Sequence, residues 1–168
     1  KGLAPLAELL LAQRRDCPDP MQAAQGFIDP EKGVETVADA LQGANDIVAE
    51  LLSDDAAIRA ALRRLYRTRG VLWAKAATDE DSVYRLYYDY REPVSRVQGH
   101  RVLAVNRGER EGMLKAGVEI EDALALQEIR RAVFRGISIS NAFVNACCED
   151  AWRRLIEPSA EREIRGEL

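Results

Sequence analysis

Histidine, cysteine and lysine are scarce in this chain of 168 residues, and long apolar runs are missing altogether. One histidine, His100, and three cysteines do not form the spaced sets that zinc requires, so we expect no metal site and no other cofactor. Three cysteines are also too few for a disulfide scaffold. Because no run of about 18 apolar residues occurs, we expect no membrane-spanning segment and no membrane partner.

The residues that are present are those of a globular protein. Hydrophobic residues make up 47% and charged residues 31% of the chain. A chain of this length buries about 70% of its unfolded surface, which is enough for a core without covalent staples. We therefore expect a single helical domain over residues 1–168. Lys1 is not an initiator methionine and the last residues end in an uncapped helical pattern, so we also expect a fragment of a longer, multi-domain protein.

Arginine dominates the positive charge of the chain. Only four of the 24 cationic residues are lysines, and the net charge is −4. Arginine suits bidentate pairing with phosphate or carboxylate, but an arginine-rich composition is also typical of GC-rich genomes. An acidic total excludes a protein that coats nucleic acid over its whole surface, while it permits a local basic patch.

Apolar residues recur at helical spacing through most of the chain, and the sequence therefore predicts an all-α fold, an irregular multi-helix bundle. At most a short strand or hairpin is expected near 112–120, and the apolar run 71–74 is compatible with extended backbone. Pro158 is expected to break the last long helix, and Thr78 is expected to cap the helix over 78–91. Helical spacing places Leu51 and Leu103 in the core. It gives the helix over 34–52 an apolar stripe of Val37, Leu41, Ala44, Ile47, Val48 and Leu51. The helices are expected over residues 3–15, 21–25, 34–52, 54–69, 78–91, 95–108, 121–134, 140–157 and 159–168.

The chain lacks the patterns of catalytic sites. It has no nucleophile elbow, phosphate-binding loop, dinucleotide fingerprint or zinc-protease motif. Cys147 and Cys148 lie in an apolar helical stretch and are expected to be buried, free thiols, as in a reducing compartment such as the cytoplasm. We predict no enzyme and no catalytic residues. A hydrolase acting on nucleic acid is the remote alternative.

A basic stripe is the candidate nucleic-acid-binding site. Arg59, Arg63 and Arg67 recur every four residues and so share one helix face, and Arg64 lies beside them. About four phosphate contacts would give a salt slope near −3 to −4 and a non-specific dissociation constant of about 10⁻⁴ to 10⁻⁶ M. The favoured interpretation is nevertheless a solvated face with Asp or Glu partners.

Two further segments have unusual compositions. Residues 84–90 contain four tyrosines, which suit base stacking or, in the favoured interpretation, packing with their hydroxyls bonded nearby. Residues 106–109, Asn-Arg-Gly-Glu, suit a ligand site or, again favoured, a structural anchor at a helix end.

An ordered set of segments carries a more specific signal than any single motif. Together the segments resemble the Tex family of bacterial transcription accessory proteins over essentially the whole chain. The segments are KGLAPLA at 1–7, ALQGANDIVAE at 40–50, SDD at 53–55, YYDYREP at 87–93, HRVLAVNRGE at 100–109, RRLIEPS at 153–159 and EIR at 163–165.

The resemblance implies the helical region of a Tex protein. In that family this region follows a helix-turn-helix stretch and precedes a ribonuclease-H-like domain, a helix-hairpin-helix pair and an S1 RNA-binding domain. It implies a non-catalytic scaffold that is associated with RNA or DNA and acts in transcription. We also expect a cytoplasmic monomer. Nucleic acid is expected to bind weakly, without sequence preference and mostly through other domains. Docking to neighbouring domains or to the transcription machinery is the alternative.

Overall fold

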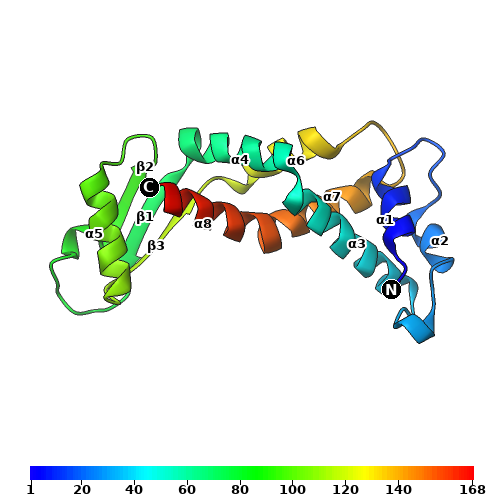
Figure 1. The fold of residues 1–168 in the computed structure, drawn as a ribbon, viewed down its shortest axis with the longest axis horizontal. Coiled ribbons are helices and arrows are strands. Elements are labelled where there is room, and N and C mark those ends of the chain that lie inside the picture. The colour runs from blue at the N-terminus through cyan, green and yellow to red at the C-terminus, as the bar shows by residue number, and fades with distance from the viewer. The chain divides into compact units, whose positions relative to one another are not determined.

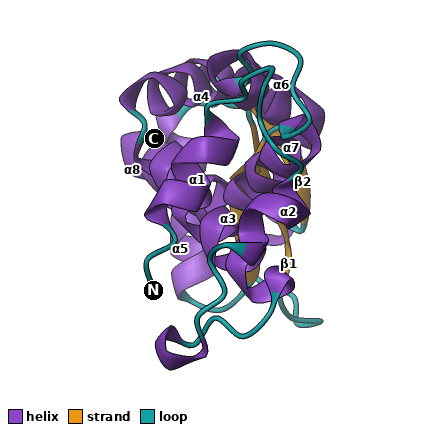
Figure 2. Ribbon diagram, turned by 90° about the vertical axis from the view of Figure 1, so that its right-hand side faces the viewer, coloured by secondary structure: helices purple, strands orange, loops and turns teal.

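The computed structural model describes residues 1–168 and is mainly helical, with 61% of the residues in helices and 11% in strands (Figure 2). The chain divides into two compact units. Unit 1 comprises Lys1–Arg59 and Leu126–Glu157, and unit 2 comprises Ala60–Ala125 and Pro158–Leu168. A single domain over 1–168 therefore stays a prediction. None of the helices combines the length and the apolar character needed to cross a membrane.

Unit 1 is built around one long helix, α3. This helix packs against α1, α2, α7 and the π-helical turn η3 (Figure 1). The C-terminal part of α6 also belongs to the unit. The elements are α1 (Ala4–Leu11), α2 (Pro20–Gln25), the 3-10 turn η1 (Pro30–Lys32), α3 (Val37–Asp54), α6 (Asp122–Val133), α7 (Asn141–Ala151) and η3 (Trp152–Ile156).

The N-terminus of α3 is fixed by a capping box. The Thr36 side chain accepts a hydrogen bond from the Asp39 backbone N–H, and the Asp39 carboxylate accepts one from the Thr36 backbone N–H. The buried stripe of α3 is rich in alanine, which lets neighbouring helices approach closely. Leu51 was expected in the core but is 51% exposed, because this stripe is rotated towards Ala49 and Leu52.

A buried glutamine ends α1 earlier than the sequence predicted. The first helix stops at Leu11 instead of near residue 15, and Gln13 takes a positive φ of 54°. The Gln13 side-chain amide donates hydrogen bonds to the Leu11 and Val133 carbonyl oxygens, at 3.0 and 2.9 Å. It also accepts one from Asn141 at 2.9 Å. Gln13 thus satisfies carbonyl oxygens at the C-terminal ends of two helices.

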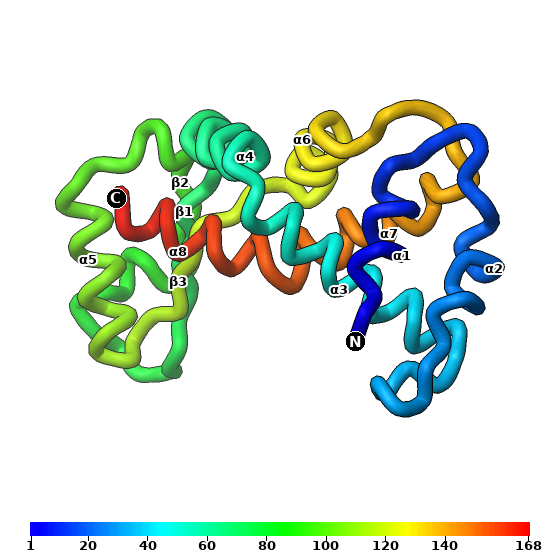
Figure 3. Tube along the Cα trace, turned by 45° about the vertical axis from the view of Figure 1, so that its right-hand side comes forward, coloured from blue at the N-terminus to red at the C-terminus, as the bar shows by residue number.

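Unit 2 contains a three-stranded antiparallel sheet in the order β2-β1-β3. Leu72, Ala74 and Leu114 face a core that Val105 of α5 closes from one side. Figure 3 shows α5 alongside the strands. The elements of the unit are most of α4 (Ala56–Arg69), β1 (Val71–Ala76), the 3-10 turn η2 (Arg85–Tyr87), β2 (Asp89–Pro93), α5 (Gly99–Arg110), β3 (Leu114–Glu119) and α8 (Glu157–Glu167).

The sheet corrects the all-α prediction. The strand expected near 112–120 is present as β3, and it pairs with β1. The C-terminal half of the helix expected over 78–91 is replaced by η2 and the first residues of β2. The polar residues that suggested a helix N-cap form turns instead. Thr78 Oγ1 accepts a hydrogen bond from Glu80 N at 3.2 Å, and Asp81 Oδ1 accepts one from Ser82 N at 3.0 Å. Short side chains of this kind stabilise turns as well as helix starts.

Pro158 does not break the last long helix. Helical backbone runs through the π-helical turn η3 into α8, and Pro158 occupies the first turn of α8. A proline lacks the N–H that would bond the carbonyl four residues earlier, and its ring crowds that carbonyl. The wider π-helical turn just before it accommodates both effects.

Candidate nucleic-acid interface

The predicted arginine stripe lies on α4, but carboxylates and a carbonyl group already bind most of it. Arg63 Nη1 lies 2.9 Å from Glu163 Oε1 of α8. Arg67 donates two hydrogen bonds to Glu167, at 2.8 and 3.2 Å, and this contact raises the pKa of the Arg67 guanidinium. Arg59 Nε donates to the Ser53 carbonyl oxygen at 2.6 Å. Arg64 is exposed.

The glutamates that pair with Arg63 and Arg67 would compete with a phosphate for these two arginines. A phosphate at Arg63 or Arg67 would have to displace a glutamate of α8, whereas Arg64 is open to solvent. Nucleic-acid binding by Arg59, Arg63, Arg64 and Arg67 therefore stays a prediction, and the geometry matches its alternative, an arginine face with acidic partners.

The tyrosine-rich segment is packed into unit 2. Tyr84 is 7% exposed and its hydroxyl donates to Glu111. The rings of Tyr87 and Tyr90 meet edge to face, with centroids 5.1 Å apart. The Tyr90 hydroxyl donates to Glu92, and burial together with that carboxylate raises the pKa of Tyr90 to about 12. These rings are used for packing, as the favoured interpretation of the sequence predicted.

The segment 106–109 anchors α8. Arg165 Nη2 donates hydrogen bonds to Asn106 Oδ1 at 2.7 Å and to Glu109 Oε1 at 2.8 Å, and the Arg165 side chain is only 18% exposed. Gly108 between them faces Leu114 and Tyr84 so closely that a Cβ would lie 2.5 Å from Leu114 Cδ1. A hollow of about 420 Å³ adjoins this contact, and its polar lining carries both signs of charge, from Glu109, Glu161, Arg162 and Arg165.

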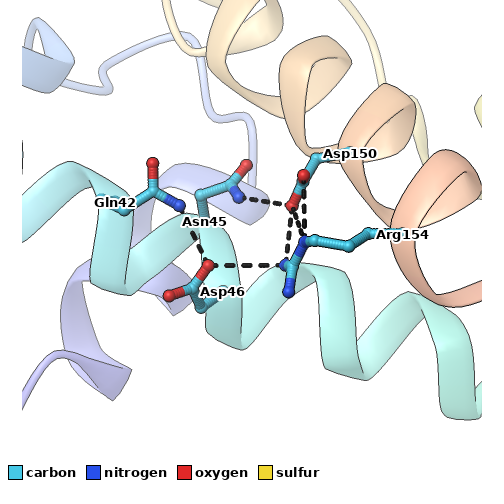
Figure 4. A network of polar contacts seen from close by, with 5 residues as sticks. All are labelled: Gln42, Asn45, Asp46, Asp150 and Arg154. Atoms are coloured by element: carbon cyan, nitrogen blue, oxygen red, sulfur yellow. Dashed lines mark hydrogen bonds and ion pairs between the residues drawn. The ribbon is translucent and has the colours of Figure 1, made fainter.

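A second polar network joins α3 to the C-terminal helices in unit 1 (Figure 4). Arg154 binds the Asp150 carboxylate through two nitrogens, at 2.8 and 3.1 Å, and reaches Asp46 of α3 at 3.5 Å. Asn45 of α3 donates to Asp150 at 2.9 Å. The hydrogen bond from Arg154 lowers the pKa of Asp150, with a smaller contribution from Asn45.

The open face of the sheet was missed by the sequence analysis. Alternation along β1 places Trp73 and Lys75 on the side of the sheet opposite the α5 core. Arg91 of β2 and Gly117 of β3 lie directly across from Trp73 in the register. A hollow of about 290 Å³ on this face is lined by residues that include Trp73, Lys75, Arg91 and Glu119. The apolar run 71–74 was the available sequence signal, but it was too short to be decisive.

The chain has few candidate nucleophiles and metal ligands. Cys147 and Cys148 are fully buried free thiols, as expected. Burial raises the pKa of Cys147 to about 12 and that of Cys148 to about 11, so neither is a thiolate at neutral pH. No group of three His, Cys, Asp or Glu side chains is placed to hold a metal ion.

Comparison with known proteins identifies the family. A family model described as Tex central region-like matches residues 16–168. The chain belongs to the Tex family. It is 39% identical, over its whole length, to the uncharacterised protein YdcI of Bacillus subtilis. Over 99% of its length it is 32% identical to the transcriptional accessory protein Tex of Neisseria gonorrhoeae.

A less similar relative is human. Over 84% of the chain, the S1 RNA-binding domain-containing protein 1 of Homo sapiens is 26% identical. The chain spans 24% of the Bacillus protein, 23% of the Neisseria protein and 16% of the human protein. It therefore corresponds to about a quarter or less of the length of these relatives.

The segments that carry the Tex resemblance contact one another. In unit 1, residues 40–50 supply Asn45 and Asp46 to the network of Arg154. In unit 2, residues 100–109 supply the partners of Arg165. Arg101 also binds Glu92 of the segment 87–93 at 3.1 Å.

Proposed function

We propose that this chain is a non-catalytic scaffold region of a Tex-type transcription accessory protein that acts in the cytoplasm. The observation that carries the proposal is the mutual pairing of the resemblance segments. Arg154, Arg165 and Arg101 all use their guanidinium groups to join elements within a unit. Groups used in this way hold a fold together and are not aimed at a substrate.

The proposal includes weak contact with RNA or DNA without sequence preference. The name of the human relative refers to RNA binding by that protein, and the name of the Neisseria relative refers to transcription. This chain has a net charge of −4, and two of the four predicted arginines are held by glutamates. Its own affinity is therefore expected to be low, with most of the binding in other domains of the longer protein.

One observation favours docking of a protein partner as the second candidate function. Large apolar side chains are exposed on surface segments, with Val83 and Leu86 of unit 2 exposed by 87% and 86%. Ile137 of unit 1 is exposed by 91%. Docking to a neighbouring domain or to the transcription machinery would cover such side chains.

Two assays on the purified chain test the proposal. Incubation with labelled RNA, DNA and nucleoside triphosphates should give no turnover. Fluorescence anisotropy with labelled oligonucleotides of unrelated sequence should give similar dissociation constants of about 10⁻⁴ to 10⁻⁶ M, which weaken as salt increases. Turnover that disappears when His100 or one carboxylate is changed would overturn the scaffold proposal. Tight, sequence-specific binding at physiological salt would overturn the proposed weak contact.

A further inference from the structure

We propose that the open face of the β2-β1-β3 sheet is a stacking platform for single-stranded nucleic acid, with one base lying against Trp73. The inference rests on the nucleic-acid contact of the proposed function and gives that contact a location. It places the contact on the sheet of unit 2, away from the arginine stripe of α4.

Trp73 lies at the centre of this face. It belongs to the central strand, and its neighbours across the register are Arg91 on one side and Gly117 on the other. Because Gly117 has no side chain, the indole can lie over β3, where a Cβ would be 2.8 Å from Trp73 Cζ2. Trp73 is half-buried, while Lys75 and Arg91 around it are exposed. The ring is therefore held in place at its edge and accessible from solvent.

The hollow beside Trp73 suits a planar ring. Its volume of about 290 Å³ lies at the lower end of the range for small-molecule sites, about 300–1,000 Å³. Every nucleobase has a π face, so a Trp platform accepts bases without sequence preference. Lys75 Nζ lies 5.6 Å from the Trp73 ring centroid and occupies the place of a base. A lysine on a flexible, exposed stem can leave the ring and meet a backbone phosphate.

The charges on this face are mixed. Exposed Lys75, Arg91 and Lys115 stand against the carboxylates of Asp89 and Glu119, and Glu161 of α8 reaches the Gly117 edge of the face. The Arg91–Glu119 ion pair, at 2.6 Å, is about half exposed on both sides, so a phosphate can compete for Arg91. None of the large exposed apolar side chains belongs to these strands. This argues for a base and against a hydrophobic protein partner.

Intrinsic fluorescence provides a direct test, because the chain has two tryptophans and the other, Trp152, is 3% exposed. The purified chain is titrated at 50 mM salt with an unlabelled oligouridylate, an oligothymidylate of the same length, and inorganic polyphosphate. Saturable quenching by both oligonucleotides, but not by polyphosphate, is the expected result. A log–log salt slope of about −2 would correspond to three phosphate contacts.

Substitutions on the sheet face show whether the oligonucleotide binds at Trp73. Anisotropy with a labelled oligonucleotide should show that Trp73→Ala weakens binding about 5- to 150-fold, whereas Trp73→Phe retains most of the affinity. Arg91→Ala and Lys115→Ala should each reduce the salt slope by about 0.7. Arg110→Ala at the exposed end of α5 is the matched control and should change neither quantity. Arg64→Ala tests the arginine stripe of α4 in the same assay. Circular dichroism checks that each variant is folded.

The remaining outcomes separate the two proposals. Oligonucleotide binding that leaves Trp73 emission unchanged, or that is lost in Arg64→Ala and kept in Trp73→Ala, overturns the stacking platform and leaves the proposed nucleic-acid contact standing. If polyphosphate quenches Trp73 emission as strongly as the oligonucleotides do, the stacking platform is overturned, because the quenching then reports the binding of phosphate charge alone. No binding at 50 mM salt overturns both the platform and the nucleic-acid contact, while the scaffold proposal stands.

Discussion

Arg63 of α4 and Glu163 of α8 form an ion pair within unit 2, with Nη1 and Oε1 2.9 Å apart. About a third of each side chain is exposed. One turn further along, Arg67 and Glu167 repeat the same pairing. Two of the four arginines that the sequence suggested as phosphate ligands, Arg63 and Arg67, therefore hold α8 in place.

Charge reversal at Arg63 should destabilise the fold. Arg63→Glu replaces an attraction by a repulsion against Glu163 and should lower the free energy of unfolding by about 1 kcal/mol, measured by urea denaturation. Adding Glu163→Arg to the same chain should restore most of the loss. Arg64→Glu, an exposed neighbour, serves as the control. Equal effects of Arg63→Glu and Arg64→Glu would contradict the structural role of the pair.

Removing the Arg165 side chain should lower the free energy of unfolding more than removing an exposed arginine does. Arg165→Ala deletes two charge-assisted hydrogen bonds from a side chain that is 18% exposed, and it should lower the free energy of unfolding by about 1–2 kcal/mol. Arg162→Ala is the matched control, because Arg162 is exposed on the same helix. If the two variants unfold at the same urea concentration, the anchor contributes nothing.

Alanine substitutions at two glycines of unit 2 should change the stability of the fold in opposite directions. A Cβ at Gly108 would lie 2.5 Å from Leu114 Cδ1 and 3.1 Å from Tyr84 Cγ, so Gly108→Ala should destabilise by about 1–3 kcal/mol. Gly166, in the last turn of α8, has open space around it, and Gly166→Ala should stabilise the fold by up to about 0.5 kcal/mol. Thermal unfolding monitored by circular dichroism measures both. A stable Gly108→Ala variant would show that Leu114 moves aside.

The helices of this fold could be predicted from periodicity, but the sheet could not. The predicted stripe of α3 shares only Ala44 and Val48 with the buried residues of this helix, whereas Val37, Leu41 and Ile47 are half-buried. Leu51 and Leu103 were assigned to the core and are 51% and 65% exposed. Both lie at the border of an apolar stripe, where a small rotation of the helix decides burial.

The strands depend on pairing between distant segments, which local pattern does not reveal. Trp73 faces Arg91 and Gly117 only because β1 pairs with both neighbours in one register. The same limit applies to the candidate site. The stripe of Arg59, Arg63 and Arg67 was visible as a spacing, whereas its acidic partners come from residues about 100 positions away.

The network around Asp150 should make unit 1 sensitive to acid. Because Arg154 and Asn45 lower the pKa of Asp150 in the folded protein, its carboxylate contributes stability above the unfolded pKa near 3.8. That stability is lost as the pH falls through the lower, folded pKa. Asn45→Ala should therefore destabilise the protein at pH 6 and have little effect well below pH 3.

Urea denaturation of wild type and Asn45→Ala at both pH values measures this difference, with Arg135→Gln on an exposed loop as the control. A carbon-13 NMR titration of the Asp150 carboxyl should also show a higher pKa in Asn45→Ala than in wild type. A stability difference that is constant with pH would mean that Asn45 acts by packing alone.

The thiols of Cys147 and Cys148 should be unreactive in the folded protein. Both side chains are fully buried, and burial raises their pKa values to about 12 and 11. Since the thiolate is the reactive form, labelling by a disulfide reagent at pH 8 should be more than about 100-fold slower than for an ordinary cysteine with a pKa near 8.5. A Cys17→Ser background confines the measurement to this pair. Two thiols should then react immediately in guanidinium chloride, and fast labelling of the folded chain would show that α7 opens or that the pair is exposed.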